Sequence, residues 1–150
     1  MNNKFRCNCP ITSALDLVGD KWTLVILKQI LIEGKQSFKD FSESDEAIAT
    51  NILASRLKML EEFKILTKDK LTNNKKVNIY HLTEKGIALT PVIIELAIWS
   101  DSNMREFHPQ MIEGEHMTLL KNNKEAFVLD IQNNYRTKIN PVLNKFQEDI

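Results

Sequence analysis

Residues 49–63 read ATNILASRLKMLEEF and predict an amphipathic helix. Leu53, Leu57 and Leu60 follow the spacing i, i+4, i+7 of a stripe that packs against a core. The opposite face begins with four short, uncharged side chains, namely Thr50, Asn51, Ala54 and Ser55. Because these side chains cover little surface, another molecule can approach the backbone of this helix closely.

The sequence after this helix predicts a two-stranded hairpin. Residues 65–71 (ILTKDKL) and 77–83 (VNIYHLT) alternate apolar and polar side chains with the period of two that strands show. The Asn-Asn pair in the connecting residues 72–76 suits a tight turn. From Ser55 to Tyr80 the chain carries seven basic and three acidic side chains, whereas the whole chain carries twenty of each sign. Positive charge is therefore concentrated in the helix and the hairpin.

Three shorter helices are predicted before residue 49, within residues 12–18, 21–34 and 38–44. Gly34 suits the carboxyl end of the second, and Ser37 suits the cap of the third. Three helices, a fourth with a polar front and a hairpin follow one another in the order of a winged helix-turn-helix. We therefore predict a mainly α fold with a small β-hairpin (α+β). In the first helix, the side chains expected to point inward are Ala14, Leu15 and Val18.

In a winged helix-turn-helix, the last helix of the triad enters the major groove of double-stranded DNA. There Asn51 is suited to a two-point contact with adenine, and Thr50 or Ser55 to contacts with bases or phosphates. Lys75 and Lys76 at the hairpin tip suit the phosphates of the flanking minor groove. The predicted DNA-binding residues are Thr50, Asn51, Ala54, Ser55, Arg56, Lys58, Lys75 and Lys76. The acidic segment 40–46 is expected to face away from the DNA.

Other functions have less support in the sequence. The four scattered glycines form no phosphate-binding loop, and the chain contains neither Gly-x-Ser-x-Gly nor His-Glu-x-x-His, so we predict no enzymatic activity and no cofactor. The alternative is a winged-helix protein-interaction module that docks a partner through its helices and its carboxy-terminal extension. The two functions differ in salt dependence, because binding to DNA phosphates weakens steeply as salt rises.

After the hairpin, residues 83–86 open a helix that is predicted to reach about Asp101 and that Pro91 is expected to bend. This helix is apolar around most of its circumference, which is more than one core-facing side uses. A partner helix would cover the remainder; burial by the carboxy-terminal extension is the alternative.

We divide the chain into a DNA-binding and dimerisation domain, residues 1–108, and an extension, residues 109–150. The extension contains helical patterns at 117–132 and 135–148, which Asn122-Asn123 and Pro141 interrupt. Its role remains open between a second dimerisation element, a partly ordered tail and a small appended subdomain.

Four motifs within about residues 7–105 resemble the HxlR-type winged-helix transcriptional regulators of bacteria, a MarR-like DNA-binding family. They are Cys-Pro before the first helix, Gly-Asp-Lys-Trp-Thr at the second, Leu-x-x-Arg-Leu-Lys-x-Leu-Glu in the fourth and Leu-Thr-x-Lys-Gly after the hairpin. The resemblance implies a homodimer on a pseudo-palindromic operator, with its two recognition helices about one DNA turn, ~34 Å, apart. It places dimer contacts in the amino-terminal segment and in the helix after the hairpin, where we predict Ile93, Ile94, Ala97, Ile98 and Trp99.

The chain departs from this family in two places. Ala49 stands where the family often has a capping serine, so the fourth helix is expected to begin earlier, at Ser44 or Asp45. The extension beyond about residue 109 is longer than these regulators usually carry, so nothing in the family assigns its role.

Cys9 stands at the family's Cys-Pro position, and some members are similar to redox or electrophile sensors that use this thiol. Oxidation to an intersubunit disulfide, or alkylation, would shift the two DNA-reading helices relative to each other. Lys4 and Arg6 are expected to favour the thiolate, and Cys7 is a candidate resolving partner. The alternative for Cys9 is a half-buried thiol that packs near the dimer contact.

The remaining features bound the setting of the protein. The cysteines and histidines lack zinc-site spacing, so no metal site is predicted. No signal peptide and no run of about 18 apolar residues is found, and two closely spaced cysteines fit a reducing compartment, so we expect a cytoplasmic protein without a membrane span. The regulated gene, the sign of regulation and any small-molecule effector are not encoded in a recognisable motif.

Overall fold

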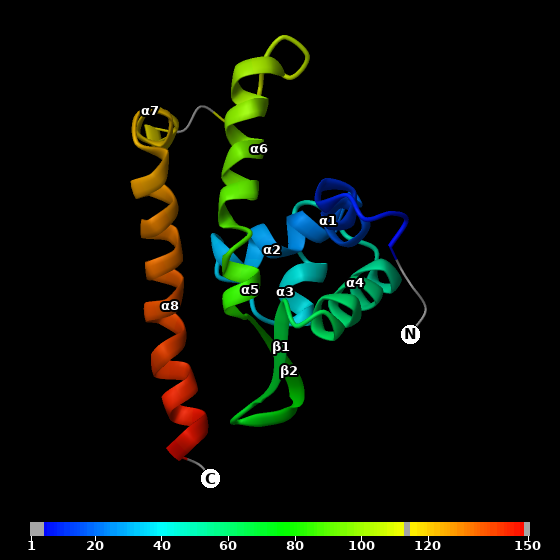
Figure 1. Ribbon diagram of the computed structural model, residues 1–150. Helices are drawn as coiled ribbons and strands as arrows, with labels where there is room; N and C mark the ends of the chain where they lie inside the picture. Colours follow the sequence, from blue (N-terminus) through cyan, green and yellow to red (C-terminus); the bar gives the residue numbers. More distant parts are fainter. Residues whose placement is uncertain (1–4, 113–114, 149–150) are drawn as a thin grey trace. The chain divides into compact units, whose positions relative to one another are not determined.

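The computed structural model describes residues 5–112 and 115–148, with side chains placed up to residue 139 apart from 115 and 116. The chain divides into two compact units, Met1–Leu82 and Thr83–Ile150. The first contains the predicted helices and hairpin, and the second contains the helices that follow (Figure 1). None of the described helices combines the length and hydropathy that crossing a lipid bilayer requires.

The helices of the amino-terminal unit are α1 (Pro10–Val18), α2 (Thr23–Leu31), α3 (Phe38–Ser42) and α4 (Thr50–Glu62). Ser37 and Asp40 form a capping box at α3, in which each side chain accepts a backbone N–H of the other residue. The Asp20 carboxylate accepts the backbone N–H groups of Trp22 and Thr23, at 3.0 and 3.1 Å, at the start of α2. These local bonds explain why the chain turns into helices at these residues.

The core of this unit is formed by α2, α3, α4 and the base of the hairpin, where Leu66, Ile79 and Leu82 are also buried. The predicted stripe of α4 is confirmed, because Leu53, Leu57 and Leu60 are all buried. They belong to the same apolar core as Ile26 of α2 and Phe41 of α3, neither of which exposes any surface. Burial of these side chains, at roughly 1.5–3 kcal/mol each, fixes α4 to the unit by one face and leaves the other outside.

Two expectations about the helices are wrong. Helix α4 does not begin at Ser44 or Asp45; it begins at Thr50, with Ala49 as a cap that offers no side-chain bond. Ala47 has a φ of 54°, in the left-handed region, which a right-handed helix cannot contain. In α1 only Val18 is buried, whereas Ala14 is exposed and Leu15 is 53% exposed.

The hairpin pairs β1 (Leu66–Leu71) with β2 (Asn74–Leu82) in antiparallel fashion, from Leu66 opposite Leu82 to Leu71 opposite Asn74. The predicted hairpin is confirmed, although β2 begins three residues earlier than the alternation indicates. The base of the hairpin is tied to the start of α3, because the Tyr80 N–H donates to the Gln36 carbonyl at 2.8 Å.

The carboxy-terminal unit consists of α5 (Glu84–Ile87), α6 (Thr90–Asn103), α7 (Glu115–Asn122) and α8 (Lys124–Glu148). The single helix expected after the hairpin is therefore interrupted at Ala88 and Leu89. Pro91 does not bend α6, because it lies in the first turn, where its missing N–H costs no helical bond. The break predicted at Asn122-Asn123 is present, whereas α8 continues through Pro141.

The carboxy-terminal extension packs along α5 and α6. Tyr135 and Ile139 of α8 are buried. The Gln132 side chain donates to the Ile87 carbonyl at 3.1 Å, and the Arg136 guanidinium pairs with Glu84 at 2.8 Å. Within this unit, α7 and α8 thus form an ordered helical arm. The domain boundary that we predict after residue 108 falls between α6 and α7 and stays a prediction.

Candidate nucleic-acid interface

The polar front of α4 is exposed over its first two turns. Thr50, Asn51, Ala54 and Ser55 all lie at the surface, while the leucines on the opposite face are buried. No large side chain of this front covers the backbone, because the four residues are short. The structure therefore brings these four predicted residues together on one accessible helix face.

Arg56 differs from these four residues because its side chain is bound to another part of the protein. Its Nε donates to Asp20 Oδ2 at 2.9 Å, so its guanidinium joins α4 to the start of α2. Burial alone would raise the pKa of Asp20, but hydrogen bonds from Thr23, Trp22 and Arg56 outweigh that effect and hold it below its usual value. Sequence reasoning missed Asp20, although an aspartate just before a helix is a recognisable capping signal.

Three predicted lysines lie at the surface of the helix and the hairpin. Lys58, Lys75 and Lys76 are exposed, and none has an ion pair or side-chain hydrogen bond within the described residues. The backbone N–H of Lys76 donates to the Asn74 side chain at 3.1 Å, which helps to shape the hairpin tip. Lys58 lies on α4, and the other two lie at the tip, so the free cations occupy the helix and the wing.

Two carboxylates of the acidic segment 40–46 are held by hydrogen bonds within the protein. Glu46 accepts hydrogen bonds from the Lys28 ammonium and the Gln29 amide, and the bond from Lys28 contributes most to lowering its pKa. Burial would raise the pKa of Asp40, but backbone N–H groups of Gln36 and Ser37 hold it below its usual value. Both carboxylates are therefore ionised at neutral pH and held by contacts within the fold. That the segment faces away from DNA stays a prediction.

Cys9 is the N-cap residue of α1, and its thiol is exposed. Its pKa is lowered by a hydrogen bond from the Thr12 backbone, and then by the Thr12 side chain and the Ile11 backbone. Arg6 is not among the groups that lower this pKa, and its Nε donates to Asp16 at 2.6 Å. Lys4 lies outside the described residues. Thr12 is a contributor that sequence reasoning missed.

The second cysteine of the amino-terminal segment is Cys7. Cys7 is also exposed and free, and its carbonyl accepts the Ser13 hydroxyl at 3.4 Å.

In the described part of the chain, no group of three or more histidines, cysteines and carboxylates is gathered as a metal would require. His81 is packed in β2, where burial lowers its pKa.

The residues predicted for a dimer contact fall into different environments. Ile93 and Ile94 of α6 are buried within a single chain, Ala97 and Ile98 are half-buried, and Trp99 is 57% exposed. Two residues that sequence reasoning did not select, Val92 and Leu96, are also exposed. Val92, Leu96 and Trp99 follow the spacing i, i+4, i+7, so they form one apolar stripe along α6, which we call the α6 stripe.

Comparison with known proteins places this geometry in a family. A sequence model described as HxlR-like helix-turn-helix matches residues 17–108. The HTH-type transcriptional regulator YodB of Bacillus subtilis (strain 168) is 38% identical over 94 residues, which are 62% of this chain and 83% of YodB. The family model covers α2 to α6 and ends before α7 and α8.

Solved structures agree with the sequence match. The reduced form of YodB from B. subtilis has a TM-score of 0.53 at 37% identity, over 65% of this chain and 96% of that chain. Its quinone-bound form has a TM-score of 0.52 at 37% identity, over 63% and 99%. The redox regulator HypR in its reduced form has a TM-score of 0.58 at 26% identity, over 67% and 99%.

The fold predicted from the sequence is confirmed by these neighbours, which share the helices and the two-stranded hairpin of a winged helix-turn-helix. The relatives are transcriptional regulators, and no enzyme family is indicated. With the family match covering more than half of the chain, and with a polar helix front and a basic wing in place, this chain belongs to the HxlR-like helix-turn-helix family of DNA-binding transcriptional regulators.

Proposed function

We propose that this regulator binds a pseudo-palindromic operator as a homodimer and that modification of Cys9 changes its affinity for that operator. One observation carries the first part: the short polar front of α4 is exposed while the leucine stripe behind it is buried. Short side chains allow the helix to approach base edges in a major groove. Lys58, Lys75 and Lys76, which have no side-chain partner in the described part of the chain, supply the charge that phosphates require.

Selection of bound fragments from genomic DNA tests operator binding. We expect a recurring sequence with two related half-sites, because two copies of α4 would each read one half. Fluorescence anisotropy with the selected duplex should then show an affinity that falls steeply as salt rises, as release of counterions demands. A chain that selects no sequence and binds duplexes weakly at every salt concentration would favour a protein-interaction module instead.

The homodimer is supported by the α6 stripe. Large apolar side chains exposed at regular spacing on one helix are typical of surfaces that another protein covers. On α1, Ile11 and Leu15 form a second exposed apolar surface, in the amino-terminal segment where the family resemblance places dimer contacts. Both surfaces are available in the single chain.

Redox sensing is supported by the exposed Cys9 thiol and by the lowered pKa that its position on α1 produces. Two such thiols, one from each subunit, form a disulfide when they pass two electrons and two protons to an oxidant such as diamide. A quinone instead forms a carbon–sulfur bond with one thiolate, and the ring gains a proton. YodB has been solved in reduced and quinone-bound forms, and HypR is a redox regulator. These relatives support both reactions as candidates for this chain.

A matched pair of cysteine variants tests this part of the proposal. Treatment with diamide or a quinone should change operator affinity in the unmodified protein and in Cys7→Ser, and should leave it unchanged in Cys9→Ser. Mass spectrometry of the treated protein identifies the modified thiol. A response that persists in Cys9→Ser would remove this residue from the mechanism.

A further inference from the structure

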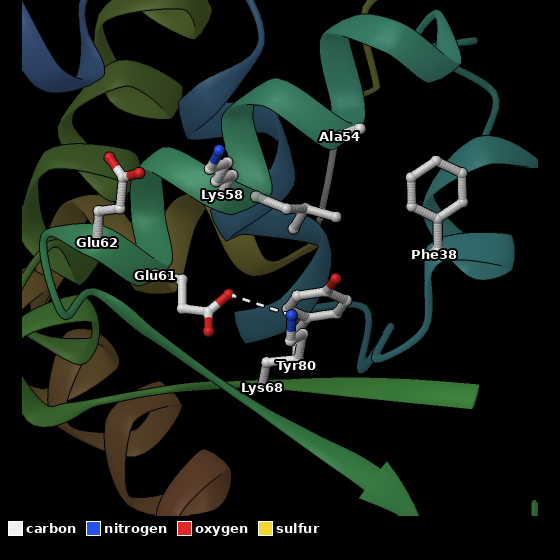
Figure 2. A pocket seen from close by; sticks show the side chains of 8 residues that line it. Phe38, Ala54, Lys58, Glu61, Glu62, Lys68 and Tyr80 are labelled. Carbon is white, nitrogen blue, oxygen red and sulfur yellow. Dashed lines mark ion pairs between the residues drawn. The ribbon is translucent and has the colours of Figure 1, made fainter. Parts of the chain in front are cut away.

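A pocket of about 580 Å³ opens beside α4, between this helix, the start of α3 and the base of the hairpin (Figure 2). Its apolar lining consists of Phe38, Ala54, Leu57 and the ring of Tyr80. The volume lies within the range of ~300–1,000 Å³ in which proteins hold small organic ligands. The lining offers two aromatic rings and two aliphatic side chains, which suits a flat apolar ligand.

The rim of the pocket carries two lysines, of which Lys58 has no partner among the side chains that the structure describes. Lys68 pairs with Glu61 across the rim at 3.7 Å, as the dashed line in Figure 2 shows. Glu62 has an interaction of its own within the protein, whereas Lys58 has none within the described residues. Lys58 is therefore an ammonium in the pocket lining that is available to an anionic group of a ligand.

The lining also offers a hydroxyl. Tyr80 is 7% exposed, and Figure 2 shows its hydroxyl directed to the Phe38 side of the pocket. Burial raises the pKa of Tyr80, so at neutral pH the phenol is protonated and can donate a hydrogen bond. An ammonium and a phenol over an apolar lining together favour a ring that carries an acceptor group with negative charge.

We propose that this pocket binds a small aromatic carboxylate, with its ring on Phe38, Leu57 and Tyr80 and its carboxylate on Lys58. Such a ligand would compete with DNA, because Ala54 and Lys58 belong both to the pocket lining and to the predicted DNA-binding face. This second step rests on the proposed function, whereas ligand binding does not. The pocket would give the regulator an effector site separate from Cys9.

Calorimetric titration of the full chain, without DNA, tests the site. The probes are benzoate and 2-naphthoate, with benzamide as the neutral analogue and inorganic phosphate as the anion without a ring. We expect 2-naphthoate to bind more tightly than benzoate, because it covers more of the apolar lining, and we expect neither benzamide nor phosphate to match them. Equal binding of phosphate and benzoate, or no binding of either aromatic acid, would overturn the proposal.

Variants identify the pocket as the place of binding. Lys58→Met keeps the length of the side chain and removes its charge, and should weaken 2-naphthoate about tenfold or more. Lys70→Met is the matched control, since Lys70 is an exposed lysine of β1 outside the pocket, and should leave affinity unchanged. Ala54→Leu fills the pocket and should also weaken binding. If Lys58→Met and Lys70→Met behave alike, the ligand does not use this pocket.

Competition with DNA separates the two claims. The concentration of 2-naphthoate that releases the selected duplex should match its affinity for the free protein, and Ala54→Leu should require more of it. A chain that binds the acid but no DNA leaves the pocket standing and refutes the proposed function. A chain that binds DNA and the acid at the same time, without competition, refutes the effector role while the site itself stands.

Discussion

Asp20 and Arg56 form a contact that links two motifs far apart in the sequence. Asp20 satisfies two N–H groups at the start of α2, and Arg56 approaches the same carboxylate from α4. We expect Asp20→Ala to lower the free energy of unfolding by about 1–2 kcal/mol, as loss of a helix cap does. Arg56→Ala should cost less, about 0.5–1 kcal/mol, because both partners are partly exposed and solvent screens the pair. Urea unfolding of both variants measures this difference.

The same contact has a pH dependence. The pKa of Asp20 is lower in the folded chain than its value of about 3.9 in an unfolded chain. Its stabilising contribution is therefore complete above about pH 4 and is lost as the pH falls through the folded-state pKa. The difference in unfolding free energy between the unmodified chain and Asp20→Ala should shrink on acidification. A difference that stays constant from pH 6 to pH 2 would contradict the assignment.

Asn51 and the wing lysines are predicted to act on different parts of DNA. Asn51→Ala should reduce the preference for the selected operator over a random duplex by about five- to hundredfold, the range of a lost two-point base contact. Lys75→Ala combined with Lys76→Ala should weaken both duplexes alike and reduce the salt slope by about two. Asn134→Ala and Lys138→Ala on α8 are the surface controls. Equal loss on both duplexes from Asn51→Ala would remove this residue from base recognition.

Thr12 tests the origin of Cys9 reactivity. Thr12→Ala removes the side-chain bond to the thiolate and leaves the backbone bond, so the pKa of Cys9 should rise without returning fully to its usual value. Alkylation of Cys9 by iodoacetamide at pH 7 should slow about two- to fivefold, because less thiolate is present. Mass spectrometry of the cysteine peptides over a pH series measures the rate. An unchanged profile would mean that the backbone groups of α1 act alone.

At the level of elements, the sequence predicts features that depend on neighbouring residues better than it predicts which surface covers a helix face. The leucine spacing of α4 and the cap at Ser37 are written within a few residues, so the sequence sufficed for both. The predicted start of α4 is too early because it rests on the preference for a capping side chain. The left-handed backbone of Ala47, which prevents the earlier start, leaves no signal in the sequence. Leu15 was placed inward because its spacing is that of a core residue, and spacing alone does not show which molecule covers a helix face.

The helical arm gives a prediction at this scale. Tyr135 of α8 is buried, whereas Leu129 on the same helix is 54% exposed. Tyr135→Ala should lower the free energy of unfolding of this unit by about 2–4 kcal/mol, as truncation of a large buried side chain does. Leu129→Ala should change it by less than about 0.5 kcal/mol. Hydrogen exchange of the α8 amides reports on this unit, and equal protection in both variants would show that the arm is not held by this packing.

At the scale of the whole molecule, the apolar circumference of the helix after the hairpin has two separate uses. Part of it is already covered in one chain, as Ile94 at 2% exposure shows, and part remains outside, as the α6 stripe shows. The sequence identified the excess of apolar residues but not this division, because it depends on which neighbours each residue meets. The predicted dimer contact therefore includes the buried Ile93 and Ile94 and omits the exposed Val92 and Leu96.

Dimerisation should therefore depend on the residues that stay exposed. Leu96→Glu combined with Trp99→Glu places charge on the α6 stripe and should convert the protein to a monomer in sedimentation equilibrium, because an unpaired carboxylate in an apolar contact is costly. Leu15→Glu tests the apolar surface of α1 in the same way. Leu129→Glu is the matched control, since it adds a carboxylate at an exposed leucine of α8. A monomer holds one recognition helix, so operator affinity should fall far more than affinity for a duplex with one half-site. Variants that remain dimeric would place the contact elsewhere on the chain.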